Sequence, residues 1–134
     1  MSKKLAVVFG IVFVIVGILG FISNPIVGRP ETNPIFVTDM LHDLVHIIIG
    51  VVLVIAGRKS EGAASKSLKV FGVVYLLLAV NGFLDSEKLL GFVAANSNDT
   101  WLHLVLGIVL LAAGFMAGSN RSEPMAMNTP GSTM

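Results

Sequence analysis

The chain has 134 residues, of which 54% are hydrophobic and 13% are charged, roughly half the charged fraction of a soluble domain. The net charge is +1 and there is no cysteine. Disulfides and thiolate metal sites are therefore excluded, and no basic cluster points to nucleic acid as a partner. The apolar residues fall into four blocks separated by polar segments, which indicates that the chain lies in a lipid bilayer.

The first apolar block follows a short basic start, and on its own this pattern resembles a signal peptide. The block is long enough to cross a bilayer, however, and no small-residue cleavage site follows it. It also has an echo further along, because Val8–Gly10 repeats as Val70–Gly72 at an offset of 62 residues. A cleaved leader has no reason to resemble an interior helix, so we predict a first membrane span here.

The three later blocks predict three further spans, because each is apolar over roughly 17 residues. The four spans are predicted at about residues 5–22, 41–57, 68–84 and 101–117. The predicted fold class is therefore an all-α integral membrane protein, a four-helix transmembrane bundle within residues 1–118.

The segments outside the spans are polar or short. Three prolines indicate a loop before the second span, and Thr38 or Asp39 is expected to cap that helix. Residues 58–66 are predicted as a polar loop, and residues 89–95 as a turn of interfacial helix or a packed loop. The tail, residues 119–134, lacks apolar periodicity, and we expect it to be disordered.

The second and fourth spans share a motif. His46–Gly57 and His103–Gly114 align at an offset of 57 residues, each with a histidine followed four and eleven residues later by glycine. Together with the echo in the first and third spans, this indicates two repeats of two spans each. Because two is an even number, both copies enter the membrane from the same side. We expect parallel repeats related by a pseudo-twofold axis along the membrane normal.

Small residues recur at a spacing of seven in all four spans, which places them two turns apart on one helix face. In lipid, close approach at small residues stabilises helix contacts, because helices gain nothing by leaving an equally apolar solvent. Apolar spans are often rich in glycine, but the shared register favours packing. The expected packing residues are Gly10, Gly17, Gly50, Gly57, Gly72, Gly107 and Gly114.

All three histidines lie on two equivalent helix stripes. His42 and His46 are on the second span and His103 is on the fourth, where Asp99 takes the position of His42. If the stripes meet, three imidazoles and one carboxylate converge, a set of ligands that suits zinc, copper or nickel. Two alternatives stay open. His46 and His103 could hydrogen-bond across the helix interface with Asp99 as an N-cap, or they could ligate a tetrapyrrole.

Asn81 is an amide in the third span, where a buried polar side chain usually joins two helices by a hydrogen bond. The sequence has no Ser/His/Asp arrangement and no glycine-rich phosphate loop. We therefore expect that the protein is not an enzyme, and we assign it no cofactor.

Three stretches carry a resemblance to a known family: the pattern LxHxxxG that opens the second span, VYLLLAVNGF in the third and NDTWLHLVLGIVLLAAG in the fourth. They resemble the bacterial family of small four-span membrane proteins that is catalogued as a domain of unknown function, DUF4383. The resemblance covers roughly residues 5–118. It implies a multi-pass protein of the bacterial inner membrane, and it implies no reaction or ligand.

Two classes of function remain. The first is a non-catalytic scaffold or accessory subunit that uses its glycine faces to pack on itself or on a larger membrane complex. The second is a ligand-binding or redox-accessory protein that uses the histidines and Asp99. The lipid bilayer is a partner in both classes.

The basic residues predict the orientation in the membrane. Seven of them lie on one side of the four spans, Lys3, Lys4, Arg58, Lys59, Lys66, Lys69 and Arg121, whereas Arg29 and Lys88 lie on the other. Basic residues favour the cytoplasmic side, so both termini should be cytoplasmic. A reporter that is active only in the cytoplasm should therefore work when it is fused after Met134. Activity of a periplasm-only reporter at that point would reverse the orientation.

Overall fold

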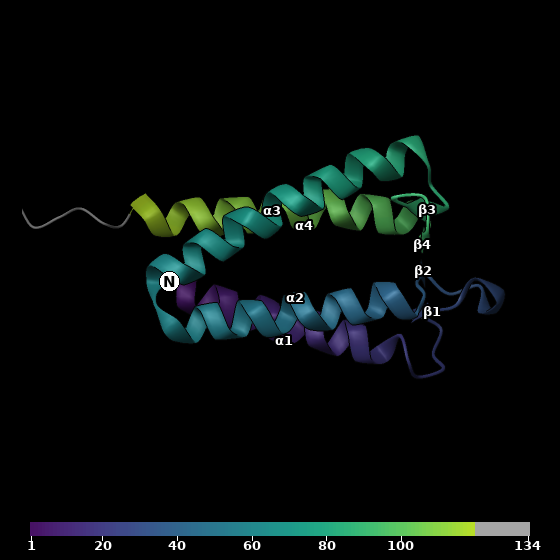
Figure 1. Cartoon of the computed structure of the whole chain (residues 1–134), viewed down its shortest axis with the longest axis horizontal. Helices are drawn as coiled ribbons and strands as arrows, with labels where there is room; N and C mark the ends of the chain where they lie inside the picture. Colours follow the sequence, from purple (N-terminus) through teal and green to yellow (C-terminus); the bar gives the residue numbers. More distant parts are fainter. Residues whose placement is uncertain (120–134) are drawn as a thin grey trace, which may run out of the picture.

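The computed structural model describes residues 1–119 as four long helices, joined at one end by short strands (Figure 1). The helices are α1 (Ser2–Leu19), α2 (Met40–Lys59), α3 (Glu61–Leu84) and α4 (Ser97–Ser119). All four are long and apolar enough to cross a membrane, so the predicted fold class is confirmed. The expected disordered tail lies outside the described residues, apart from Ser119, with which α4 ends.

All four helices begin before the predicted spans, α2 and α4 also end after them, and α3 ends where it was predicted to end, at Leu84. The predicted loop at 58–66 shrinks to Ser60, which ends α2 and caps α3 by accepting a hydrogen bond from the N–H of Ala63. α1 ends three residues early, at Leu19, and the carbonyl of Leu19 accepts a hydrogen bond from the side-chain amide of Asn24. Hydropathy marks the apolar part of a helix, whereas its polar ends continue into the interface.

The two connections at the far end of the bundle contain short strands. In the first, β1 (Val27–Gly28) pairs in parallel with β2 (Phe36–Val37) around the 3-10 turn η1 (Pro30–Thr32). In the second, β3 (Lys88–Leu89) and β4 (Val93–Ala94) form an antiparallel hairpin. The interfacial helix considered for residues 89–95 is therefore wrong. Leu90 and Gly91 both have positive φ, which turns the chain back on itself. We call this the loop end of the bundle.

Each half is a tight pair of helices, α1 with α2 and α3 with α4 (Figure 1). A Cβ atom built on Gly50 would lie 2.5 Å from the carbonyl oxygen of Gly10, and one on Gly10 would lie 2.6 Å from that of Gly50. In the second half, a Cβ on Gly72 would lie 3.1 Å from the oxygen of Gly107. The glycine faces therefore bring backbones together inside each half, where close approach stabilises the pair.

The two halves repeat the same contacts. Gly20 packs directly against the side chain of Asp43 near the loop end of the first half. In the second half, the equivalent Gly82 packs against Thr100, which stands at the position equivalent to Asp43. The matching positions indicate that the two-span repeat is structural as well as sequential.

The interior and the surface are both apolar. Leu53, Leu68 and Leu110 are completely buried where the four helices meet. Large hydrophobic side chains also cover the outside, among them Ile55, Leu77 and Ile108, each more than half exposed. A surface of this kind matches the hydrocarbon of a membrane and would be unusually apolar for a soluble protein.

The glycine contact between α1 and α2 generates a test. Gly50→Leu should lower the free energy of unfolding of the purified protein in detergent by about 1–3 kcal/mol or more, because the helices would have to separate. Its melting temperature should fall accordingly. Val51→Leu is the matched control, since Val51 is the next residue of α2 and is 45% exposed to the outside. The control should melt like the wild type. Equal melting of both variants would show that Gly50 is not at a packed interface.

Candidate functional site

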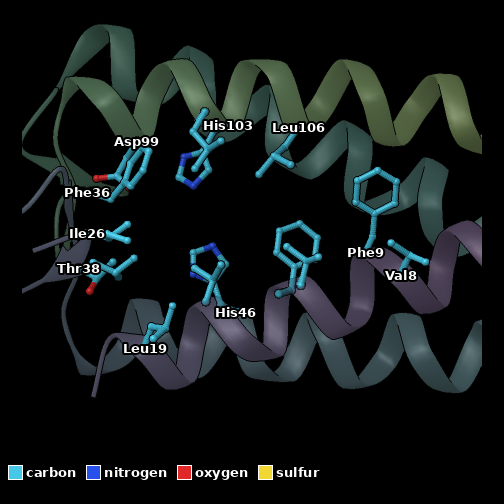
Figure 2. A pocket seen from close by; sticks show the side chains of 15 residues that line it. Val8, Phe9, Leu19, Ile26, Phe36, Thr38, His46, Asp99, His103 and Leu106 are labelled. Carbon is cyan, nitrogen blue, oxygen red and sulfur yellow. The ribbon is translucent and has the colours of Figure 1, made fainter. Parts of the chain in front are cut away.

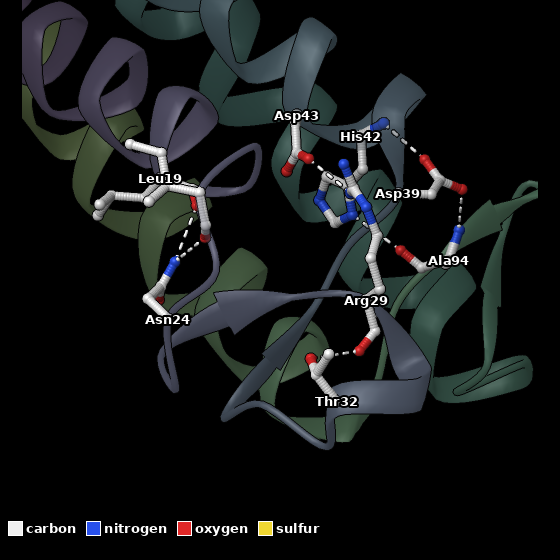
Figure 3. A network of polar contacts seen from close by, with 9 residues as sticks. Leu19, Asn24, Arg29, Thr32, Asp39, His42, Asp43 and Ala94 are labelled. Carbon is white, nitrogen blue, oxygen red and sulfur yellow. Dashed lines mark hydrogen bonds and ion pairs between the residues drawn. The ribbon is translucent and has the colours of Figure 1, made fainter.

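At the loop end, α2 of the first half is tied to the hairpin of the second half. Asp39 caps α2 by accepting a hydrogen bond from the N–H of His42, 2.8 Å away, through Oδ1. Its other oxygen, Oδ2, accepts from the N–H of Ala94 in β4, also at 2.8 Å. Figure 3 shows both contacts. Partial burial tends to raise the pKa of Asp39, but the backbone N–H groups that donate to its carboxylate outweigh this effect, and the net pKa is lowered.

The start of α4 is tied to the first half in the equivalent way. Oδ2 of Asp99 accepts hydrogen bonds from the N–H of Val37 in β2, at 3.1 Å, and from the N–H of Asn96, at 2.9 Å. Asn96 returns a bond by accepting from the N–H of Asp99, which completes a capping box. Val37 and Ala94 are equivalent in the repeat, so the halves exchange hydrogen bonds at the loop end.

An ion pair between a partly exposed arginine and a buried carboxylate anchors the first connection to the bundle. A guanidinium nitrogen of Arg29, which follows β1, lies 2.6 Å from Oδ2 of Asp43 on α2, whose side chain is completely buried (Figure 3). The carbonyl of Arg29 accepts from the hydroxyl of Thr32 within the same connection. A buried carboxylate needs such a partner, so this pair holds the connection down over the helix ends.

The three histidines come together directly beneath these connections. His42, His46 and His103 are 4%, 6% and 2% exposed, and one candidate ligand atom from each lies within 4.8 Å of the others. The ring centroid of His42 lies 4.7 Å from that of His46 and 5.8 Å from that of His103. In Figure 2, His46 and His103 point toward one another from opposite sides of a cavity.

The hydrogen bonds of the three rings differ. Nδ1–H of His42 donates to the carbonyl of Ala94 at 2.8 Å, which leaves Nε2 with its lone pair free. The Nδ1 atoms of His46 and His103 are buried and have no hydrogen-bond partner among the described residues. The structure therefore lacks the hydrogen bond across the interface that was one interpretation of this pair. Buried polar atoms without partners are costly, which favours a bound ligand.

Asp99 does not join the group of three. It lines the same cavity, but the group whose ligand atoms lie close together consists of histidines alone. The N-cap alternative for Asp99 is wrong in its position, because α4 begins at Ser97 and Asn96 is the capping residue, whereas the carboxylate of Asp99 accepts from the N–H groups of Asn96 and Val37. The spacing of Asn96 and Asp99, three residues apart before an apolar run, is the sequence signal that indicates this capping role.

Two aromatic rings complete the surroundings of the histidines. Phe13 and Tyr75, which are equivalent in the repeat, stack on each other with centroids 5.3 Å apart. Phe13 also stacks on His46 at 5.8 Å, and Tyr75 meets His103 edge to face at 5.2 Å. The motifs of the four spans do not by themselves place these rings in a site. Their equivalence in the repeat is the signal that could have placed them beside the histidines, near the pseudo-twofold axis.

Asn81 has a different role from the one expected. It lies in the last turn of α3, and its side-chain oxygen accepts a hydrogen bond of 2.8 Å from the N–H of Leu90. Leu90 belongs to the turn of the β3–β4 hairpin. The amide therefore positions the hairpin that carries Ala94, and through it His42, instead of joining two helices.

A family model described as a domain of unknown function (DUF4383) matches residues 3–116, a stretch that runs from α1 into the last turns of α4. No curated protein and no solved structure matches the chain.

The contacts of Asp39 generate a test of the tie between the halves. Asp39→Asn has one carbonyl oxygen where two acceptors are used, so it should lower the free energy of unfolding by about 1–3 kcal/mol. Asp85→Asn is the matched control, because one oxygen of the exposed Asp85 accepts from both Glu87 and Lys88. It should be nearly neutral.

The effect of Asp39→Asn should also depend on pH. A carboxylate with a lowered pKa stabilises the folded state above its ordinary value of 3.8, and this contribution is lost as the pH falls through the lowered value. The difference between wild type and variant should thus persist at pH 5–7 and shrink below about pH 3.8. A difference that does not change with pH would contradict the role of the charge.

Proposed function

Since this chain belongs to the family described as a domain of unknown function (DUF4383), whose description names no activity, we propose its function from the site. The four helices make it a multi-pass membrane protein. We propose that it binds one transition-metal ion through His42, His46 and His103, as a non-catalytic protein of the bacterial inner membrane. Both termini are then cytoplasmic, and the histidines lie near the outer face.

The observation that carries this proposal is the convergence of three buried ligand atoms within 4.8 Å of one another. Nitrogen ligands bind zinc at about 2.0–2.1 Å, so in a tetrahedral site they lie roughly 3.4 Å apart. Small rotations of the rings would close the remaining gap of about 1.4 Å or less. Imidazole suits zinc, copper and nickel, and three protein ligands leave one coordination position open.

The contact of His42 supports the same assignment. A histidine that binds a metal usually donates its other N–H to a backbone carbonyl or a carboxylate, which fixes the ring and its tautomer. His42 has this arrangement, with Nδ1–H on the carbonyl of Ala94. Its free Nε2 is then the atom that would bind the ion.

A tetrapyrrole fits this site poorly. The cavity beside the histidines has a volume of about 260 Å³, below the roughly 300–1,000 Å³ of pockets for drug-sized ligands. The ring of His42 also lies against both His46 and His103, where the macrocycle would have to pass. A small ion needs no such space.

The contacts of the glycine faces indicate that these faces pack helices within the chain and are not surfaces for binding another protein. Gly10, Gly50, Gly72 and Gly107 all contact the neighbouring helix of their own half, so they are already used. Contacts with a second copy or with a larger membrane complex would have to use the lipid-facing side chains. The histidine site, and not a glycine surface, therefore carries the function that we propose.

Metal analysis tests the proposal. Protein purified without chelators should contain about one zinc, copper or nickel per chain by elemental mass spectrometry, or bind one when it is added. His46→Gln and His103→Gln should abolish the metal, because an amide is a poor ligand for these ions. Tyr75→Phe and Asp99→Asn should retain it, since neither residue is among the three ligands.

Two results would overturn the metal site. One is wild-type protein that neither contains metal nor binds it when it is added. The other is full occupancy in both histidine variants.

A further inference from the structure

A cavity of about 260 Å³ lies between α1 and α4, on the side where the two halves meet. Its walls are aliphatic and aromatic side chains from both helices, such as Phe9 and Phe13 of α1 and Leu106 of α4, and residues of the first connection close it at the loop end. Val8 and Val12 also line it and are about half exposed. The cavity therefore reaches the lipid-facing surface of the bundle.

The polar groups of this cavity gather at one end. Figure 2 shows Thr38 and Asp99 at the loop end, His46 and His103 next to them, and apolar side chains such as Leu106 and Phe9 beyond. Asp99 is engaged by backbone N–H groups. The hydroxyl of Thr38, which is 1% exposed, has no hydrogen-bond partner among the described residues.

These groups determine what kind of ligand the cavity can take. A hydroxyl and a neutral imidazole can each donate or accept a hydrogen bond, so they match a carbonyl or a hydroxyl oxygen equally well. No lysine or arginine lines the cavity, so an anion would find no opposite charge. The ligand is therefore neutral, mostly apolar, and carries oxygen at one edge.

The volume of the cavity and the side chains that line it narrow the class of ligand further. A cavity of about 150 Å³ is sufficient for benzene, so 260 Å³ accommodates a six-membered ring with substituents. Phe9, which lines the cavity, offers an aromatic side chain for contact with such a ring. An apolar tail on the ring could leave past Val8 and Val12 into the surrounding lipid.

We propose that this cavity binds the head group of a membrane-soluble quinone, with one carbonyl oxygen at Thr38, His46 and His103 and its tail in the lipid. The proposal does not depend on the metal ion. An ion takes one nitrogen of each ring and leaves the other as an N–H group. The two sites can thus be occupied separately or together.

Binding of a short-chain quinone to the detergent-purified protein tests this proposal. Titration calorimetry with decyl-substituted benzoquinone should show saturable binding of one molecule per chain, also after the metal has been removed with a chelator. Decylbenzene, which has a six-membered ring of similar size and the same tail but no oxygen, should bind at least tenfold more weakly. Equal binding of the two probes, or no quinone binding at all, would overturn the proposal.

Two variants locate the binding site. Leu106→Trp should fill the cavity and reduce quinone affinity at least tenfold, whereas Leu77→Trp, on the lipid-facing side of α3 and 63% exposed, should leave it unchanged. Thr38→Val keeps the shape of the side chain and removes the hydroxyl, so it should weaken binding several-fold without loss of folding. Unchanged affinity in both cavity variants would place the quinone elsewhere.

The same measurements separate the two proposals. Quinone binding to a chain that never takes up metal would overturn the metal site alone. Metal binding without quinone binding would overturn the quinone site alone. Leu106→Trp and Thr38→Val should retain the metal, because neither change alters the three ligands.

Discussion

The fold depends on backbone contact at glycine. Within a bilayer, helices do not gain by hiding apolar side chains from one another, so they need close approach to hold together. Gly10 and Gly50 provide it in the first half, and Gly72 and Gly107 in the second. Each pair of helices is therefore closed by its own glycines. The larger and more specialised side chains are left to fill the space between the halves, which is where the candidate sites lie.

The second constraint is the exchange of hydrogen bonds at the loop end. His42 and Asp99 occupy equivalent positions, and each binds the strand of the opposite half. His42 donates to a carbonyl of β4, whereas Asp99 accepts from an N–H of β2, so the same bracing is achieved with opposite polarity. This difference breaks the symmetry of the repeat. It places a third imidazole beside the symmetric pair of His46 and His103, so that a residue that braces the loop end also belongs to the ligand set that we propose.

Buried imidazoles without protein partners are the feature that most needs a functional explanation. Desolvated nitrogen atoms cost free energy unless something binds them, and the Nδ1 atoms of His46 and His103 have no such partner among the described residues. The rings also form one wall of an apolar cavity. A metal ion would take one nitrogen of each ring, and a quinone head group would occupy the cavity beside the rings. Both proposals follow from the same unmet polar groups.

The sequence by itself determined the local features: four spans, two parallel repeats, the glycine register, and His46 and His103 at equivalent positions. These follow from helical periodicity and from internal similarity, which need no knowledge of the fold. Only the tertiary structure decided which residues meet across the halves. It directed Asp99 to the backbone of β2, Asn81 to the hairpin turn, and His42 to the side of the other two histidines. The cavity too is visible only in the tertiary structure. It depends on where a connection folds over the opposite half, and that position produces no periodic pattern in the sequence.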